Sequence, residues 1–190
     1  ERAQAYAEES LTIGRQIGEK RGVARSTSLL GLIGSQQGKH LAAQARLEES
    51  LASRVEIGYQ QGIASSLNKL GFVYLATGET TEARVTLAEA LKHAHKIGAE
   101  TLRLEAVIGY ARLRFAADEA GHAAEWCALV ARQEALSADI KQLRLEPLLA
   151  ELKTKLGADE FKAAQERGKA LKLDTVVSQL LAETNVTSTS

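Results

Sequence analysis

Apolar side chains recur at helical spacing along almost the whole chain, and short polar or glycine-containing breaks interrupt them at regular intervals. The first segment, for example, places Ala3, Ala7 and Leu11 on one side of a helix. Residues 137–145 read either as a connection or as a continued helix. Elsewhere the pattern predicts helices over residues 2–18, 23–37, 40–58, 63–77, 80–97, 100–120, 122–136, 147–155, 159–168 and 175–183. The expected fold is therefore all-α.

The helical pattern repeats with a period of about 40 residues, a length typical of arrays of helical hairpins. Residues 1–38 and 41–78 are identical at 15 of 38 positions, and the run from Glu8 to Leu11 returns as Glu48 to Leu51. In such an array each unit buries its apolar face against the next. Gly31 and Gly71 fall in mid-helix, where we expect two helices to approach closely.

The third copy of the repeat departs from this spacing. Matching the stretch from Leu113 to Gly121 with the stretch from Leu70 to Gly78 shifts the register by three positions. Gly121 is then expected in the turn, with Arg114 in place of the mid-helix glycine and Trp126 in place of a small residue.

The repeats and the flanking segments suggest a division of the chain. We expect helical repeats over residues 1–140, capping helices over residues 141–183 and a disordered polar tail over residues 184–190. Residue 1 has the phase of residue 41, which starts the second helix of a unit. The first repeat is thus expected to be incomplete, and the chain a piece of a longer protein.

Composition excludes several classes of function. The 190 residues carry 24 basic and 24 acidic side chains, so we expect no direct contact with nucleic acid, which requires a basic face. No segment reaches the roughly 20 apolar residues of a membrane span, so we expect no membrane partner. A single cysteine, Cys127, cannot form an internal disulfide and fits a reducing compartment. These features predict a cytoplasmic location.

The residues with catalytic or metal-binding chemistry do not form a motif. His93 and His95 lie two residues apart on a helix and point in different directions, so they cannot hold one ion together. Cys127 lies in an alanine-rich helix and is expected to be buried. The chain contains no glycine-rich phosphate loop. We therefore expect no catalytic residue, no metal and no cofactor, and we do not expect an enzyme.

One copy of the repeat resembles the tetratricopeptide repeat. That motif has a Leu-Gly pair, an aromatic residue three positions later, a turn glycine and small and large residues on the second helix, here Leu70, Gly71, Tyr74, Gly78, Ala83, Leu87 and Ala90. The period of this chain is longer than the 34 positions of that family. The longer period resembles the repeat arrays of large bacterial transcription regulators of the MalT and LuxR-type ATPase class.

The C-terminal stretch resembles the segment that closes the repeat region of those regulators. It carries Leu156, Gly157, Phe161, Ala164, Gly168, Leu171, Leu173 and Val177. The resemblance implies a right-handed superhelix of antiparallel helix pairs, located behind an ATPase module in a signalling or transcription regulator. It also implies that the first helix of each pair lines a concave surface.

By that resemblance, the concave surface is the candidate binding site. Its candidate residues are Arg25, Ser28, Leu32, Ser35, Gln36, Ser65, Asn68, Phe72, Leu75 and Phe115. We expect Arg25, Ser28 and Asn68 to form a polar patch beside an exposed Phe72. The expected partner is a protein, a peptide or a small effector, together with other domains of the parent chain. The first helix, where exposed, offers a surface for self-association.

Two functions fit these features, and a third is weakly supported. The first is a sensor or interaction region of a bacterial signalling regulator, in which binding biases a two-state equilibrium. The second is a general scaffold for protein assembly without a signal input. An enzyme lacks support, because no nucleophile–base pair stands out in the sequence.

Overall fold

The computed structural model describes residues 2–187, with side chains up to Glu183, and these residues form helices joined by short turns. The expected all-α fold is confirmed, since the described residues include no strand. The chain divides into two compact units, residues 1–86 and residues 87–190, here called unit 1 and unit 2. The boundary lies within helix α5 (Thr80–Lys96).

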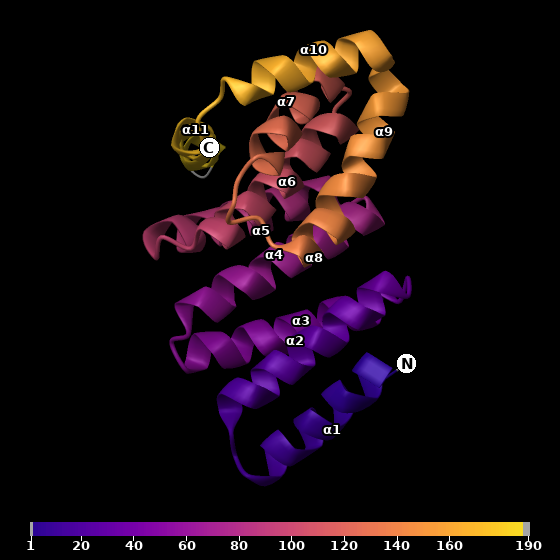
Figure 1. Ribbon diagram of the computed structural model, residues 1–190. Coiled ribbons are helices and arrows are strands. Elements are labelled where there is room, and N and C mark those ends of the chain that lie inside the picture. The colour runs from indigo at the N-terminus through magenta and orange to yellow at the C-terminus, as the bar shows by residue number, and fades with distance from the viewer. Residues whose placement is uncertain (1, 188–190) are drawn as a thin grey trace. The chain divides into compact units, whose positions relative to one another are not determined.

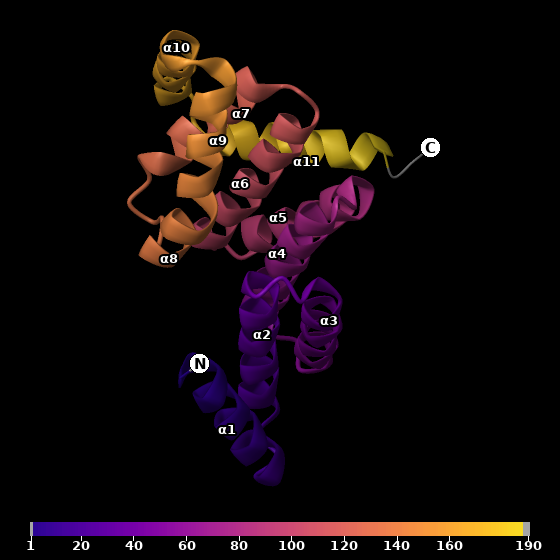
Figure 2. The same cartoon turned by 90° about the vertical axis from the view of Figure 1, so that its right-hand side faces the viewer.

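Unit 1 is a series of helices in which each packs against the next. Its complete helices are α1 (Arg2–Gln16), α2 (Lys20–Gln36), α3 (His40–Glu56) and α4 (Gln60–Thr77). Short turns make consecutive helices antiparallel (Figure 1), and α2 lies between α1 and α3 (Figure 2). We call α2 and α4 first-type helices and α1 and α3 second-type helices, because the two types alternate within each period of the sequence.

The close approach expected at the mid-helix glycine is confirmed at Gly31. A Cβ atom on this residue would lie 2.8 Å from Cγ of Leu47 and 3.2 Å from the backbone oxygen of Ala43. Both neighbours belong to α3, and both are fully buried. A side chain at position 31 would therefore push α2 away from α3.

Left-handed turns recur at even intervals along the repeats. The turn residues have φ between 65° and 81°, and they are Gly18, Gly38, Gly58, Gly78, Gly98 and Asp118. Glycine adopts this conformation without steric cost, and aspartate tolerates it better than most residues. Both hairpin turns and the links between hairpins are thus built in the same way.

This spacing corrects the expected shift of register in the third copy. Asp118 occupies the place of Gly78, so the third copy keeps the period of the first two. Gly121 lies inside α7 (Ala120–Ala131) and not in the turn. The small residue equivalent to Ala83 is Ala123, which is fully buried, and Trp126 does not replace it. The sequence match failed because the turn residue of this copy is not a glycine.

Unit 2 continues from the second part of α5 with a longer series of helices. These are α6 (Glu100–Ala116), α7, α8 (Ala138–Ile140), the π-helical segment η1 (Lys141–Leu145), α9 (Glu146–Leu156), α10 (Ala158–Lys169) and α11 (Leu173–Thr187). The expected helix over 122–136 ends earlier, at Ala131, and residues 132–137 form a connection. Residues 138–156 then form one continuous helical segment, and Pro147 lies in the first turn of α9. The expected division at residue 140 falls inside this segment.

In unit 2, α10 crosses α7 at short range. A Cβ atom on Gly168 would lie 2.2 Å from the backbone oxygen of Glu125 and 2.8 Å from Cβ of Ala128. Gly168 is therefore a packing residue near the end of α10, and the helix continues to Lys169. Figure 2 shows α9, α7 and α10 grouped together within this unit.

The last helix, α11, packs through a buried apolar face. Leu173, Val176, Val177 and Leu180 are all buried. The helix extends to Thr187, beyond the expected end at residue 183, so residues 184–187 are helical rather than a tail. Residues 188–190 of the expected tail lie outside the described residues.

Candidate functional site

The candidate binding residues of α2 lie at different depths. Arg25 and Gln36 are exposed, Leu32 and Ser35 are half-buried, and Ser28 is buried. The expected polar patch therefore keeps Arg25 at the surface, whereas Ser28 belongs to the interior.

The candidates on α4 are more buried than expected. Ser65 and Leu75 are half-buried, but Asn68 is fully buried and Phe72 is only 7% exposed. The expectation of an exposed Phe72 is wrong. The reason is that α4 is covered on more than one side, since Leu70 and Val73 are buried as well. Helical periodicity alone does not reveal a second covered face.

Unit 1 also contains a buried polar cluster that the sequence analysis missed. We define the buried serine–arginine cluster as Ser50, Arg54 and Ser66. The Ser50 hydroxyl donates to the backbone oxygen of Ala24 (2.7 Å) and lies 3.4 Å from the Ser66 hydroxyl. Nη1 of Arg54 donates to the backbone oxygen of Gly62 (2.7 Å) and to the Ser66 hydroxyl (2.8 Å). The cluster thus connects α2, α3 and α4.

Arg54 is an unusual member of this cluster, because it is a buried cation. It is 5% exposed, and burial lowers the pKa of its guanidinium, while the nearby Tyr59 has the opposite, smaller effect. Within residues 2–187, oxygens of a carbonyl and a hydroxyl, rather than a carboxylate, accept its hydrogen bonds. Its contacts hold the turn between α3 and α4, so its role is structural.

One signal of this cluster was visible in the sequence. Ser10 and Ser26 stand one period before Ser50 and Ser66. The hydroxyl of Ser26 donates to that of Ser10 (3.0 Å), which repeats the Ser50–Ser66 contact one period earlier. A pair of serines shared by the two copies therefore marked a polar contact between neighbouring helices.

In unit 2, the candidate Phe115 lies in an open groove. We define the Phe115 groove by Phe115 at the end of α6 and by Ala150, Glu151, Thr154 and Lys155 along α9. The groove encloses about 670 Å³ and is lined mainly by apolar atoms. Phe115 is half-buried, so its ring is accessible from the groove. Its equivalents one and two periods earlier are Leu75 and Ser35, which are also half-buried.

Two ion pairs border the Phe115 groove. Nη1 of Arg112 lies 2.6 Å from Oε2 of Glu151, and Nζ of Lys155 lies 2.9 Å from Oδ1 of Asp118. The Lys155–Asp118 pair is largely exposed, so it contributes little to stability and can exchange partners. Both pairs join the end of α6 and its following turn to α9.

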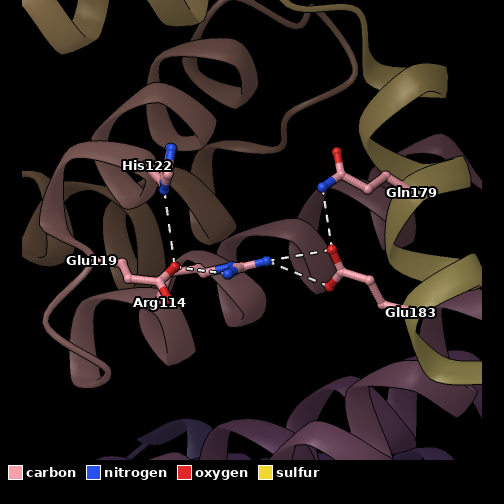
Figure 3. Close-up of polar contacts among 5 residues, drawn as sticks. All are labelled: Arg114, Glu119, His122, Gln179 and Glu183. Atoms are coloured by element: carbon pink, nitrogen blue, oxygen red, sulfur yellow. Dashed lines mark hydrogen bonds and ion pairs between the residues drawn. The ribbon is translucent and has the colours of Figure 1, made fainter. Parts of the chain in front are cut away.

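Arg114, which precedes Phe115 in the sequence, connects α6 with α7 and α11 (Figure 3). Its guanidinium lies 5.3 Å from the centre of the Trp126 ring, 2.7 Å from Oε2 of Glu119 and 3.4 Å from both carboxylate oxygens of Glu183. Gln179 donates to Glu183 (3.2 Å) within α11. The Arg114 guanidinium therefore helps to hold α11. Its charge is already paired with the carboxylates of Glu119 and Glu183.

The cysteine and the histidines, which could serve in catalysis or metal binding, lie apart from one another. The expected burial of Cys127 is confirmed, and burial raises the pKa of its thiol to about 12. Of the four histidines, His95 on the last turn of α5 and His122 in α7 are exposed. Over the described residues, histidine, cysteine and carboxylate side chains do not gather into a group able to hold a metal ion. None of the described helices is both long and apolar enough to cross a membrane.

Comparison of the chain with protein-family models, with curated proteins and with solved structures found no match.

Proposed function

We propose that this chain is a non-catalytic interaction module of a larger bacterial signalling or transcription regulator, and that it binds a peptide segment of a protein partner. The Phe115 groove is the observation that carries this proposal, because it is open, mainly apolar and placed at a candidate binding residue. The helical repeat supports the regulator setting through its resemblance to such arrays. The cytoplasm is the proposed location.

The groove suits a segment with one apolar anchor and a neighbouring carboxylate. The anchor would pack on the Phe115 ring, which gives a large contact area at low entropic cost. The carboxylate would draw Lys155 away from Asp118, because that exposed pair is weak. A bound segment would then change how α6 and α9 are linked, which gives a way to transmit binding to other parts of the parent protein.

Selection from a library of phage-displayed peptides tests the proposal. We expect enriched sequences to share an apolar residue beside an acidic residue. Phe115→Asp should weaken their binding by about tenfold or more, since the anchor contact is lost. Lys155→Gln should weaken it by roughly threefold, the typical worth of one exposed ion pair. Binding is measured by fluorescence anisotropy of a labelled peptide.

Lys162→Gln is the matched control, because it removes an exposed lysine from α10, outside the groove. It should leave peptide affinity unchanged. Peptides that bind Phe115→Asp as well as the original protein would contradict the assignment of the groove.

A further inference from the structure

Helix α1 exposes a stripe of side chains whose equivalents in the next copy of the repeat are all less exposed. We define the α1 stripe as Ala3, Tyr6, Ser10 and Ile13 of α1 together with Ile17 directly after its end. These residues follow one another at spacings of three and four, so those in the helix share one face. All five are exposed, with Tyr6 69%, Ile13 48% and Ile17 70% accessible. So large an apolar stripe on one helix indicates an interface.

The equivalent face of α3 shows what covers such a stripe. Ala43 and Ser50, which stand one period after Ala3 and Ser10, are fully buried. Helix α2 covers them: the backbone oxygen of Ala43 lies near Gly31, and the Ser50 hydroxyl donates to the backbone oxygen of Ala24. The α1 stripe therefore continues the α2–α3 interface by one period.

Ser10 makes only one of the two contacts of its equivalent. It accepts from Ser26 of α2, just as Ser50 contacts Ser66 of α4. The second contact of Ser50, to a backbone oxygen of the first-type helix before it, has no counterpart at Ser10 among the described residues. This difference points to an antiparallel helix as the group that would complete the pattern.

The α1 stripe also differs from the equivalent face of α3, and these differences indicate which side chains a partner helix should carry. Tyr6 and Ile13 replace Arg46 and Ser53, so the flanks of the face are more apolar. Ala7 replaces Leu47, whose Cγ is the nearest atom to the missing side chain of Gly31. A helix that packs on α1 thus needs no glycine at its equivalent of position 31, and it has room there for a larger side chain.

We propose that the α1 stripe docks a first-type helix from a further repeat of the same kind, antiparallel to α1, with an apolar residue at the position of Gly31. This surface is separate from the Phe115 groove, and the inference does not depend on the proposed function.

The test adds such a helix to the full chain. A copy of residues 19–40, which contains α2 and its turn, is fused directly before residue 1, because residue 40 precedes residue 41 in the same phase. A second fusion carries Gly31→Leu within the added copy only. We expect amide hydrogen exchange in α1 to slow by about tenfold or more in both fusions, and further in the second. The melting temperature of α1, followed through Tyr6, should rise by about 5 °C.

Two matched substitutions locate the effect. Ala3→Glu places a charge in the stripe and should abolish the protection of α1. Ala5→Glu is the control, because Ala5 and its equivalent Ala45 are both exposed; the protection should remain. Unchanged exchange in α1 with the fused helices would overturn the proposal. Sedimentation of the unfused protein as a dimer that Ala3→Glu dissociates would overturn it as well, since a second copy would then occupy the stripe.

Discussion

Arg54 shows how a single buried polar residue can hold two neighbouring helices of unit 1. Its guanidinium satisfies a backbone oxygen of α4 and a buried hydroxyl at once. Hydrogen bonds from a charged donor are stronger than neutral ones, and a buried acceptor left without a partner carries a desolvation cost.

We expect Arg54→Ala to lower the free energy of unfolding of unit 1 by about 3 kcal/mol, because it leaves a cavity and unsatisfied oxygens at Gly62 and Ser66. Hydrogen exchange of the α3 and α4 amides measures this loss. Arg25→Ala is the control, since Arg25 is exposed on α2, and its effect should stay within about 0.5 kcal/mol. Equal effects of both substitutions would show that Arg54 does not hold the turn.

Cys127 should be unreactive while unit 2 is folded. Burial raises the pKa of its thiol from 9.0 to about 12, so the nucleophilic thiolate is nearly absent at pH 8. We expect negligible labelling by iodoacetamide at pH 8 and complete labelling in urea. The pKa of the Cys127 thiol is higher in the folded than in the unfolded state. The contribution of this thiol to the free energy of unfolding is therefore present below pH 9 and is lost as the pH rises towards 12. Rapid labelling of the folded protein would contradict this burial.

The burial of Cys127 could be predicted from the sequence, whereas the burial of Arg54 could not. The burial of Cys127 follows from its alanine-rich helix. Arg54 could not be identified in the same way, because Gly14 and Ala94 occupy its position in the neighbouring copies. A long basic side chain at such a position is ordinarily assigned to the surface.

The crossing of α7 and α10 depends on the absence of a side chain at Gly168. We expect Gly168→Ala to destabilise unit 2 by about 3 kcal/mol or more, because the added carbon would overlap the Glu125 backbone oxygen, which cannot move like a flexible side chain. Urea unfolding followed by the fluorescence of Trp126, the single tryptophan, measures the effect.

Gly121→Ala provides the comparison for this crossing. Its added carbon would meet only the end of Arg167, at 4.0 Å, and alanine favours the helical state. The expected result is a gain of about 0.5–1 kcal/mol. A loss of stability at Gly121 similar to that at Gly168 would mean that both effects arise from the backbone and not from packing.

The turn between α6 and α7 should become more stable with glycine. Asp118 has φ 65°, which disfavours residues with a Cβ atom, and its ion pair with Lys155 is exposed. We expect Asp118→Gly to raise the free energy of unfolding by about 0.5 kcal/mol, whereas Asp118→Val should lower it by more than about 1 kcal/mol. Thermal unfolding followed by circular dichroism distinguishes the two signs, and a gain with valine would refute the turn assignment.

The same turn explains why the third repeat was misaligned. A glycine-based match favours Gly121, but the backbone requires a left-handed residue, and aspartate can supply it. The helix ends and the packing of the third copy are therefore set by the turn at Asp118 and not by the position of Gly121. The expected hairpins were therefore right in kind and wrong by three residues in position.

For the whole molecule, the balance of charges predicts that solubility is lowest in a narrow pH range. Basic and acidic residues are equal in number, and the isoelectric point is about 7.2. Mutual repulsion between molecules is then weakest near neutral pH. We expect the polyethylene glycol concentration needed for precipitation to be lowest near pH 7 and higher at pH 5.5 and pH 9. A steady trend across this range would show that exposed apolar surfaces, and not net charge, govern association.

The sequence predicts the all-α fold and the antiparallel pairing, because both depend on local periodicity and turn residues. It predicts the candidate site less well, because exposure depends on which neighbouring helices cover each face. Phe115 and Phe72 are both aromatic residues in the second half of a first helix in a pair, yet Phe115 lies in a groove and Phe72 is buried. Periodicity could not separate them, since it does not show how many faces of a helix are covered.

The even spacing of left-handed turns has a consequence for how genes encoding such chains can change. Turns of the same kind lie one period apart, and turns of the other kind lie midway between them. Recombination between two codons for like turns inserts or deletes one complete hairpin, and each surviving helix keeps a neighbour of the proper type. An exchange between unlike turns would place two second-type helices in succession and unfold the product. Homologous chains should accordingly differ in length by whole hairpins and not by single helices.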